Sequence, residues 1–124
     1  MANPNIVAVS SIYGKTVYDT DVSTSATALV SNAASSGKVL KINSLIIANI
    51  DGTNAADITV TLRQTSNASV LHSTIANTVS VPADATLVVI SKDTSIYLEE
   101  DQALYVVASA SGDLSATCSY EEIS

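Results

Sequence analysis

Strict alternation of apolar and polar residues over short segments constrains the fold of this chain more than any other feature. Between Asp57 and Arg63, the apolar residues Ile58, Val60 and Leu62 alternate with polar ones. The same alternation runs near the end of the chain, where one side carries Leu114, Ala116, Cys118 and Tyr120. Successive side chains of a strand point to opposite faces of a sheet, so both segments are predicted to be half-buried antiparallel strands.

The segment from Val39 to Ile50 predicts a central strand with an unusual second face. One face carries Leu40, Ile42, Ser44, Ile46, Ala48 and Ile50. The opposite face starts with Lys41 and Asn43 but continues with Leu45 and Ile47. Either another part of the chain or a neighbouring subunit must cover these two side chains. We favour the subunit, and assign Leu45 and Ile47 to a contact in a homo-oligomer with a trimer as its closed form.

Further strands and turns complete a β-rich pattern. The apolar runs 87–90 and 103–108 predict buried strands, and Pro82 marks a break between strands because it lacks a ladder donor. Residues 23–34 contain several alanines, but their Ser and Thr residues favour a strand followed by a loop over a helix. We therefore expect one domain over residues 1–124, an all-β antiparallel sandwich that resembles a jelly roll.

The charge of the chain argues against two classes of partner. The formal net charge is −7, and the five basic residues do not cluster in the sequence. Nucleic acids and anionic membranes are bound through basic surfaces, so neither is an expected partner. We find no apolar stretch of about 18 residues and no signal peptide, and expect synthesis in a cytoplasm.

Candidate catalytic and metal-binding residues are few. His72 is the only histidine, no Gly-x-Ser-x-Gly pattern occurs, and alternation turns Cys118, the only cysteine, inward. We therefore expect no enzyme activity, no catalytic residue, no cofactor and no metal site. The acidic segments 99–101 and 121–122 are interpreted as turn and surface residues, with Ca²⁺ binding as the open alternative.

Residues 1–7, 11–16, 36–57 and 81–100 form a set of segments that extends over nearly the whole chain. These segments resemble small virion structural proteins of marine tailed phages, cyanophages in particular. The resemblance implies a component of a phage particle, located on the head or the tail, with no catalytic residues to transfer.

These observations lead to three hypotheses of different class. The first is a non-enzymatic virion structural protein, a head decoration protein that coats or stabilises the capsid together with other virion proteins. The second is a carbohydrate-binding or receptor-binding module on the tail or neck. The third, a hydrolase built on His72, ranks last because the Gly-x-Ser-x-Gly pattern is absent and a Ser-His-acid triad can be drawn in any chain rich in serine.

Overall fold

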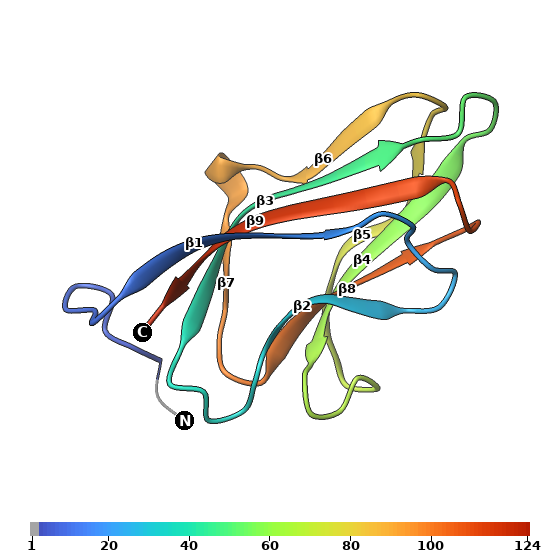
Figure 1. Ribbon diagram of the computed structural model, residues 1–124. Coiled ribbons are helices and arrows are strands. Elements are labelled where there is room, and N and C mark those ends of the chain that lie inside the picture. The colour runs from blue at the N-terminus through green and yellow to red at the C-terminus, as the bar shows by residue number, and fades with distance from the viewer. Residues whose placement is uncertain (1–2) are drawn as a thin grey trace.

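The computed structural model describes residues 3–124, which contain nine strands and one short 3-10 helix (Figure 1). The elements in chain order are β1 (Ile12–Asp19), β2 (Thr27–Asn32), β3 (Val39–Asn49), β4 (Ala56–Gln64), β5 (Leu71–Val81), β6 (Thr86–Ile90), η1 (Lys92–Thr94), β7 (Ile96–Leu98), β8 (Gln102–Ala108) and β9 (Leu114–Ile123). No helix within the described residues is long and apolar enough to cross a bilayer.

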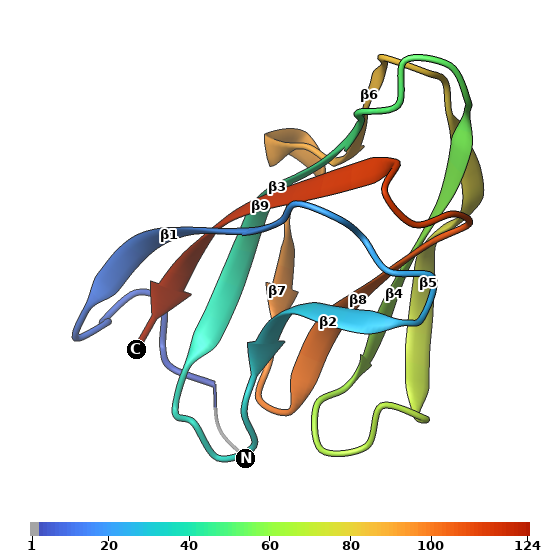
Figure 2. The same cartoon turned by 45° about the vertical axis from the view of Figure 1, so that its right-hand side comes forward.

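The strands form two antiparallel sheets that pack face to face around one core (Figure 2). One sheet has the order β1-β9-β3-β6, with β7 also paired to β3, and the other has the order β2-β8-β4-β5. The pairing is nested: the first strand pairs with the last, β2 with β8, β3 with β6 and β7, and β4 with β5. Apart from the short β7, which makes the first sheet five-stranded, this order is that of a jelly roll wound from the outside in, so the predicted fold class is confirmed.

The alternating segments occupy the positions that their patterns predict. Ile58 and Val60 of β4 are fully buried, and Leu114 and Cys118 of β9 are buried in the same core. The segment 39–50 is central in its sheet, because β3 pairs with β9 on one side and with β6 and β7 on the other. The segment 23–34 contains a strand, β2, followed by a turn.

The prediction that Leu45 and Ile47 lie on the face opposite Ile42 is wrong. In the pairing of β3 with β9, Ile42 is opposite Tyr120 and Ser44 is opposite Ser119, so Asn43 is an extra residue. An extra residue shifts the alternation by one position and turns the following side chains to the other face. Leu45 and Ile47 are both 0% exposed in the core of their own chain and offer no surface to a neighbouring subunit.

The segment 87–90 also differs from its prediction as a buried strand. β6 lies at the edge of its sheet and pairs only with β3, so its outward side chains meet solvent. Val88 is 56% exposed, while Leu87 and Val89 pack against the core. A continuous apolar run does not distinguish a strand buried on both faces from an edge strand with an apolar outer face.

Two buried asparagines fasten the loops at opposite ends of the sandwich. Asn49, at the end of β3, donates from Nδ2 to the backbone carbonyls of Asn54 and Val81, both at 2.9 Å. Asn32, at the end of β2, donates to the carbonyls of Lys38 and Leu98 at 2.9 and 3.1 Å. Because buried polar groups without partners are costly, these bonds hold the ends of both sheets in a defined arrangement.

Candidate assembly surface

An uncharged row of side chains crosses the outer face of the β1-β9-β3-β6 sheet. Tyr18 of β1 is paired with Thr117 of β9, Thr117 with Ile46 of β3, and Ile46 with Val88 of β6. Tyr18 is 70% exposed and Val88 is 56% exposed, and the two residues between them are half-buried. We call these four residues the Tyr18–Val88 row.

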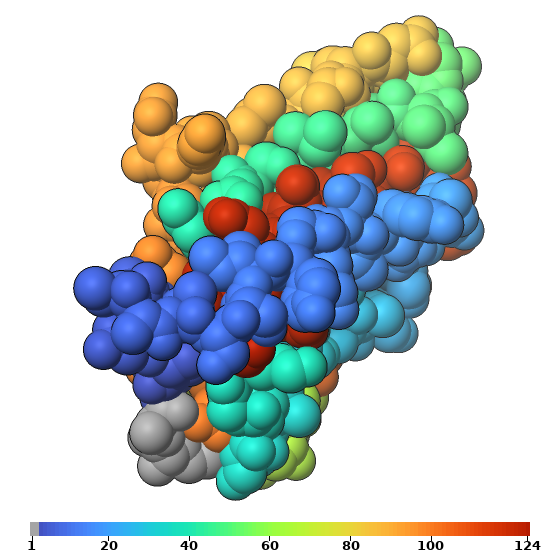
Figure 3. All heavy atoms as spheres, turned by 60° about the vertical axis from the view of Figure 1, so that its left-hand side comes forward, coloured from blue at the N-terminus to red at the C-terminus, as the bar shows by residue number. Residues whose placement is uncertain are grey.

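The register shift at Asn43 creates this row as well as the core beneath it. Because the alternation of β3 changes phase there, Leu45 and Ile47 turn inward and Ile46 turns outward. Val17 packs against the core on β1, so its neighbour Tyr18 points away from the core. Figure 3 shows this side of the molecule, where the blue residues of β1 lie beside the red residues of β9 and the green residues of β3.

Small polar residues surround the row. Ser44 of β3 pairs with Ser119 of β9, which pairs with Thr16 of β1 on the same face. On the other side of the row, Ala48 pairs with Ser115. The middle of this face therefore carries no charged side chain, although the whole chain has a net charge of −7. When another protein covers a surface of this kind, few charged groups lose their hydration.

Half of the twelve acidic residues lie at one end of the sandwich, where no basic residue within residues 3–124 offsets them. The loops β1–β2, β3–β4, β5–β6 and β8–β9 all lie at this end, and in or next to them are Asp19, Asp21, Asp51, Asp57, Asp84 and Asp113. Backbone bonds connect the loops, as from Ile50 N to Asp113 O at 2.7 Å. A hydrogen bond from the backbone of Thr53 is the main cause that lowers the pKa of Asp51. All five basic residues lie outside these loops.

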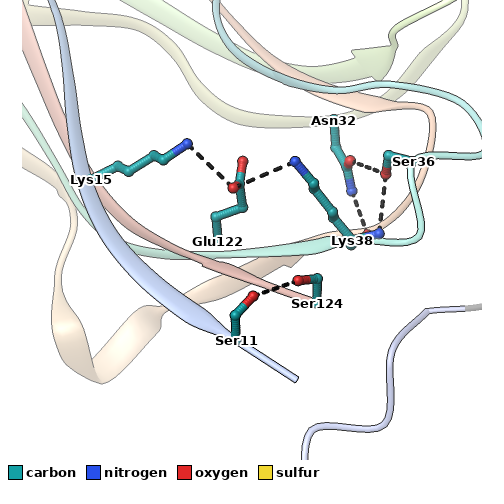
Figure 4. A network of polar contacts seen from close by, with 7 residues as sticks. All are labelled: Ser11, Lys15, Asn32, Ser36, Lys38, Glu122 and Ser124. Atoms are coloured by element: carbon teal, nitrogen blue, oxygen red, sulfur yellow. Dashed lines mark hydrogen bonds and ion pairs between the residues drawn. The ribbon is translucent and has the colours of Figure 1, made fainter. Parts of the chain in front are cut away.

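An ion-paired cluster closes the opposite end, between the two sheets (Figure 4). Oε2 of Glu122 on β9 forms two ion pairs. It lies 3.2 Å from Nζ of Lys15 on β1 and 3.5 Å from Nζ of Lys38 in the β2–β3 loop. The Glu122 side chain is 18% exposed and the lysines 45% and 42%, so water screens both pairs. The cluster therefore contributes modestly to stability and mainly fixes the position of the loop beside β1.

The outer face of the other sheet uses its one cation for internal contacts. The guanidinium carbon of Arg63 lies 5.3 Å from the centre of the Tyr105 ring. Its Nε donates to Thr61 Oγ1 at 2.9 Å, and its Nη1 donates to the carbonyl of Ala68 at 3.2 Å. Arg63 thereby fastens the β4–β5 loop to its strand, which accounts for its half-buried position.

The residues considered for chemistry lie apart from one another. His72 is exposed on β5, at the edge of its sheet, and Cys118 is buried in the core. Burial raises the pKa of the Cys118 thiol to about 12, which keeps it protonated and unreactive at neutral pH. Within residues 3–124, no three His, Cys, Asp or Glu side chains are grouped in a way that would hold a metal ion.

Asp101 fastens two loops to each other rather than forming a site with its acidic neighbours. Its carboxylate accepts hydrogen bonds from Gln64 Nε2, Ser66 N and Ser66 Oγ, each at 2.8 Å. The bond from Gln64 is the largest of the causes that lower its pKa. These contacts join the β7–β8 turn to the β4–β5 loop.

Sequence reasoning missed the Tyr18–Val88 row, although a signal for it was present. Asn43 and Ser44 are adjacent polar residues in an otherwise alternating strand. Two neighbouring polar positions mark a change of phase, after which the inward residues are Leu45 and Ile47 rather than Ile46.

No protein-family model and no curated protein matches this chain.

Proposed function

We propose that the chain is a non-enzymatic structural protein of a bacteriophage virion, a head decoration protein that attaches to the capsid through the Tyr18–Val88 row. The observation that carries the proposal is this row. It places two exposed apolar side chains and a half-buried isoleucine on the uncharged middle of a sheet face. The resemblance of the sequence to virion proteins of marine tailed phages supplies the particle as the setting.

The shape and charge of the domain support attachment through this face. Exposed apolar patches with a polar rim are typical of protein–protein contacts, and aromatic residues are enriched in them. The acidic loops lie at one end of the sandwich, and of their carboxylates only that of Asp19 directly follows a residue of the row, Tyr18. The four residues of the row are themselves uncharged, so contact through them covers no carboxylate of the row.

The proposed partners are the other virion proteins, and the proposed location is the particle itself. The expectation of a trimer rested on Leu45 and Ile47, and it loses that basis because the core of the chain encloses both side chains. Self-association through the Tyr18–Val88 row is a separate question, which sedimentation of the purified chain answers directly.

Localisation on purified virions tests the proposed function. The experiment combines mass spectrometry of the particles of the phage that encodes the chain with immunogold labelling by antibodies against it. We expect the chain in the particles and label distributed over the head. Label confined to the tail or neck would favour a receptor-binding or carbohydrate-binding module instead. Absence of the chain from the particles would overturn the virion assignment.

A further inference from the structure

A shallow cavity lies between the N-terminal segment and the end of the β1-β9-β3-β6 sheet. Its volume is about 420 Å³, and it is lined by Asn3, Pro4, Ile6, Val39, Tyr97 and Glu99. Asn3 Nδ2 donates to Glu99 Oε1 at 2.7 Å and so joins the two sides of the cavity. The cavity therefore combines a segment from the start of the chain with the β3–β7 pair.

The register of β3 places the inner wall of this cavity on the outer face of the sheet. Leu40 points into the core, so its neighbour Val39 points outward, as does Tyr97 beside the core residue Leu98. Val39 is only 3% exposed, whereas Tyr97 is 43% exposed. The inner wall is thus aliphatic, and an accessible aromatic ring lies beside it.

We propose that this cavity binds a lysine side chain of a partner protein. The proposal does not depend on a role in the virion. The aliphatic stem of lysine fits against Val39, Pro4 and Ile6, because lysine buries its methylene groups on apolar surfaces and keeps its ammonium group in water. The ammonium group then pairs with Glu99 and lies near the ring of Tyr97.

The charge of the cavity lining favours a cation over an anion. Glu99 is the one charged residue among those that line the cavity, because Glu100 is buried and the Asp101 carboxylate is bonded to Gln64 and Ser66. Lys38, next to Val39, is ion-paired with Glu122, and Lys41, opposite Tyr97 on β3, lies outside the lining. A sugar would need several hydrogen-bonding groups, but the polar lining side chains apart from the Tyr97 hydroxyl are Asn3 and Glu99, which bond to each other.

Titration of the full chain with n-butylammonium chloride, a mimic of the lysine side chain, tests the proposal. Binding is followed by two-dimensional NMR of the ¹⁵N-labelled protein at constant ionic strength. We expect saturable shifts of the amides of Val39, Tyr97 and Glu99, with smaller shifts from 1-butanol and none from sodium butyrate. Equal shifts from butanol and butylammonium would overturn the role of charge, and no shift at these amides would overturn the site. Binding of methyl glucoside in place of butylammonium would identify a sugar site and also overturn the proposal.

Variants separate the charge of the site from the general acidity of the chain. Glu99→Gln retains an oxygen that accepts from Asn3 but removes the charge, and we expect about fivefold weaker butylammonium binding. Tyr97→Leu should weaken it about threefold. Asp93→Asn removes an exposed charge that does not line the cavity, and should leave binding unchanged. Equal weakening by Glu99→Gln and Asp93→Asn would show attraction by net charge alone, and would overturn the site.

Discussion

Ile42 and Leu45, three residues apart on β3, point into the same core because Asn43 is an extra residue in the pairing of β3 with β9. In a regular strand, residues three apart lie on opposite faces. The extra residue therefore decides which side chains of the central strand form the core and which form the Tyr18–Val88 row. The first two predictions examine this relationship.

Ile47→Asp should unfold the chain, whereas Ile46→Asp should leave it folded. Ile47 is 0% exposed, so the substitution buries an unpaired carboxylate and should cost about 4 kcal/mol of unfolding free energy. Ile46 faces outward on the same strand, where aspartate should cost about 1 kcal/mol. Circular dichroism with thermal melting compares the two, and a native-like melt of Ile47→Asp would contradict the burial of its side chain.

Deletion of Asn43 should be tolerated better than deletion of Ile46. Without Asn43, Ile42, Ser44 and Leu45 alternate regularly and keep their present partners on β9, so we expect a loss of about 1 kcal/mol. Without Ile46, the outward and inward residues exchange faces along half of β3, and the core loses its side chains. Urea unfolding of the two deletion variants gives the comparison. Equal destabilisation would show that Asn43 is not the extra residue.

The stability of the chain should decrease with alkaline pH in a way that depends on Cys118. The folded state raises the thiol pKa from 9.0 to about 12, so it binds the proton more tightly than the unfolded state. Stability from this group is complete below pH 9 and is lost as the pH rises toward 12, with a slope of at most about 1.4 kcal/mol per pH unit.

Cys118→Ala removes this contribution and serves as the comparison. We expect it to fold with a loss of about 1 kcal/mol at neutral pH and to show a smaller decrease in stability above pH 9. In the native wild-type chain, a thiol reagent should react slowly, and it should react fast after denaturation. Rapid labelling of the native chain would place Cys118 on the surface.

Asp101→Asn should destabilise the chain at neutral pH and reduce its sensitivity to acid. The pKa of the Asp101 carboxyl is lowered from 3.8, so its stabilisation is present above that pH and is lost as the pH falls through the lowered value. Asparagine tolerates the positive φ of 64° at this position, so the substitution tests the charge and its hydrogen bonds. Asp84→Asn, at a φ of 60°, is the matched control. Equal acid sensitivity of the two variants would contradict the role of Asp101.

The sequence predicts the fold class and most of the core, but not which face of the sheet every side chain of β3 and β6 occupies. Clean alternation places Ile58, Val60, Leu114 and Cys118 correctly, because both strands are regular where these residues lie. The alternation of β3 fails as a guide after Asn43, since one extra residue exchanges the two faces. The edge position of β6 depends on which strands pair, and this long-range information is absent from a local apolar run.

Adjacent Asn43 and Ser44 signal the phase change in β3, but the sequence does not show which residues of other strands lie beside Ile46. The Tyr18–Val88 row draws one residue from each of four strands, and each of its three pairs joins segments that are distant in the chain. The cavity at Glu99 likewise needs the N-terminal segment to lie beside β7. Neither arrangement leaves a contiguous motif.

Binding of the purified chain to virions made without it tests attachment through the row most directly. The triple variant Tyr18→Ser, Ile46→Thr and Val88→Thr removes the apolar side chains of the row, and Leu71→Ser with Val79→Ser makes similar changes on exposed β5 residues. We expect the wild-type chain and the β5 variant to bind to the heads, and the folded row variant to remain in solution. Normal binding of the row variant, with a native melting curve, would contradict attachment through this face.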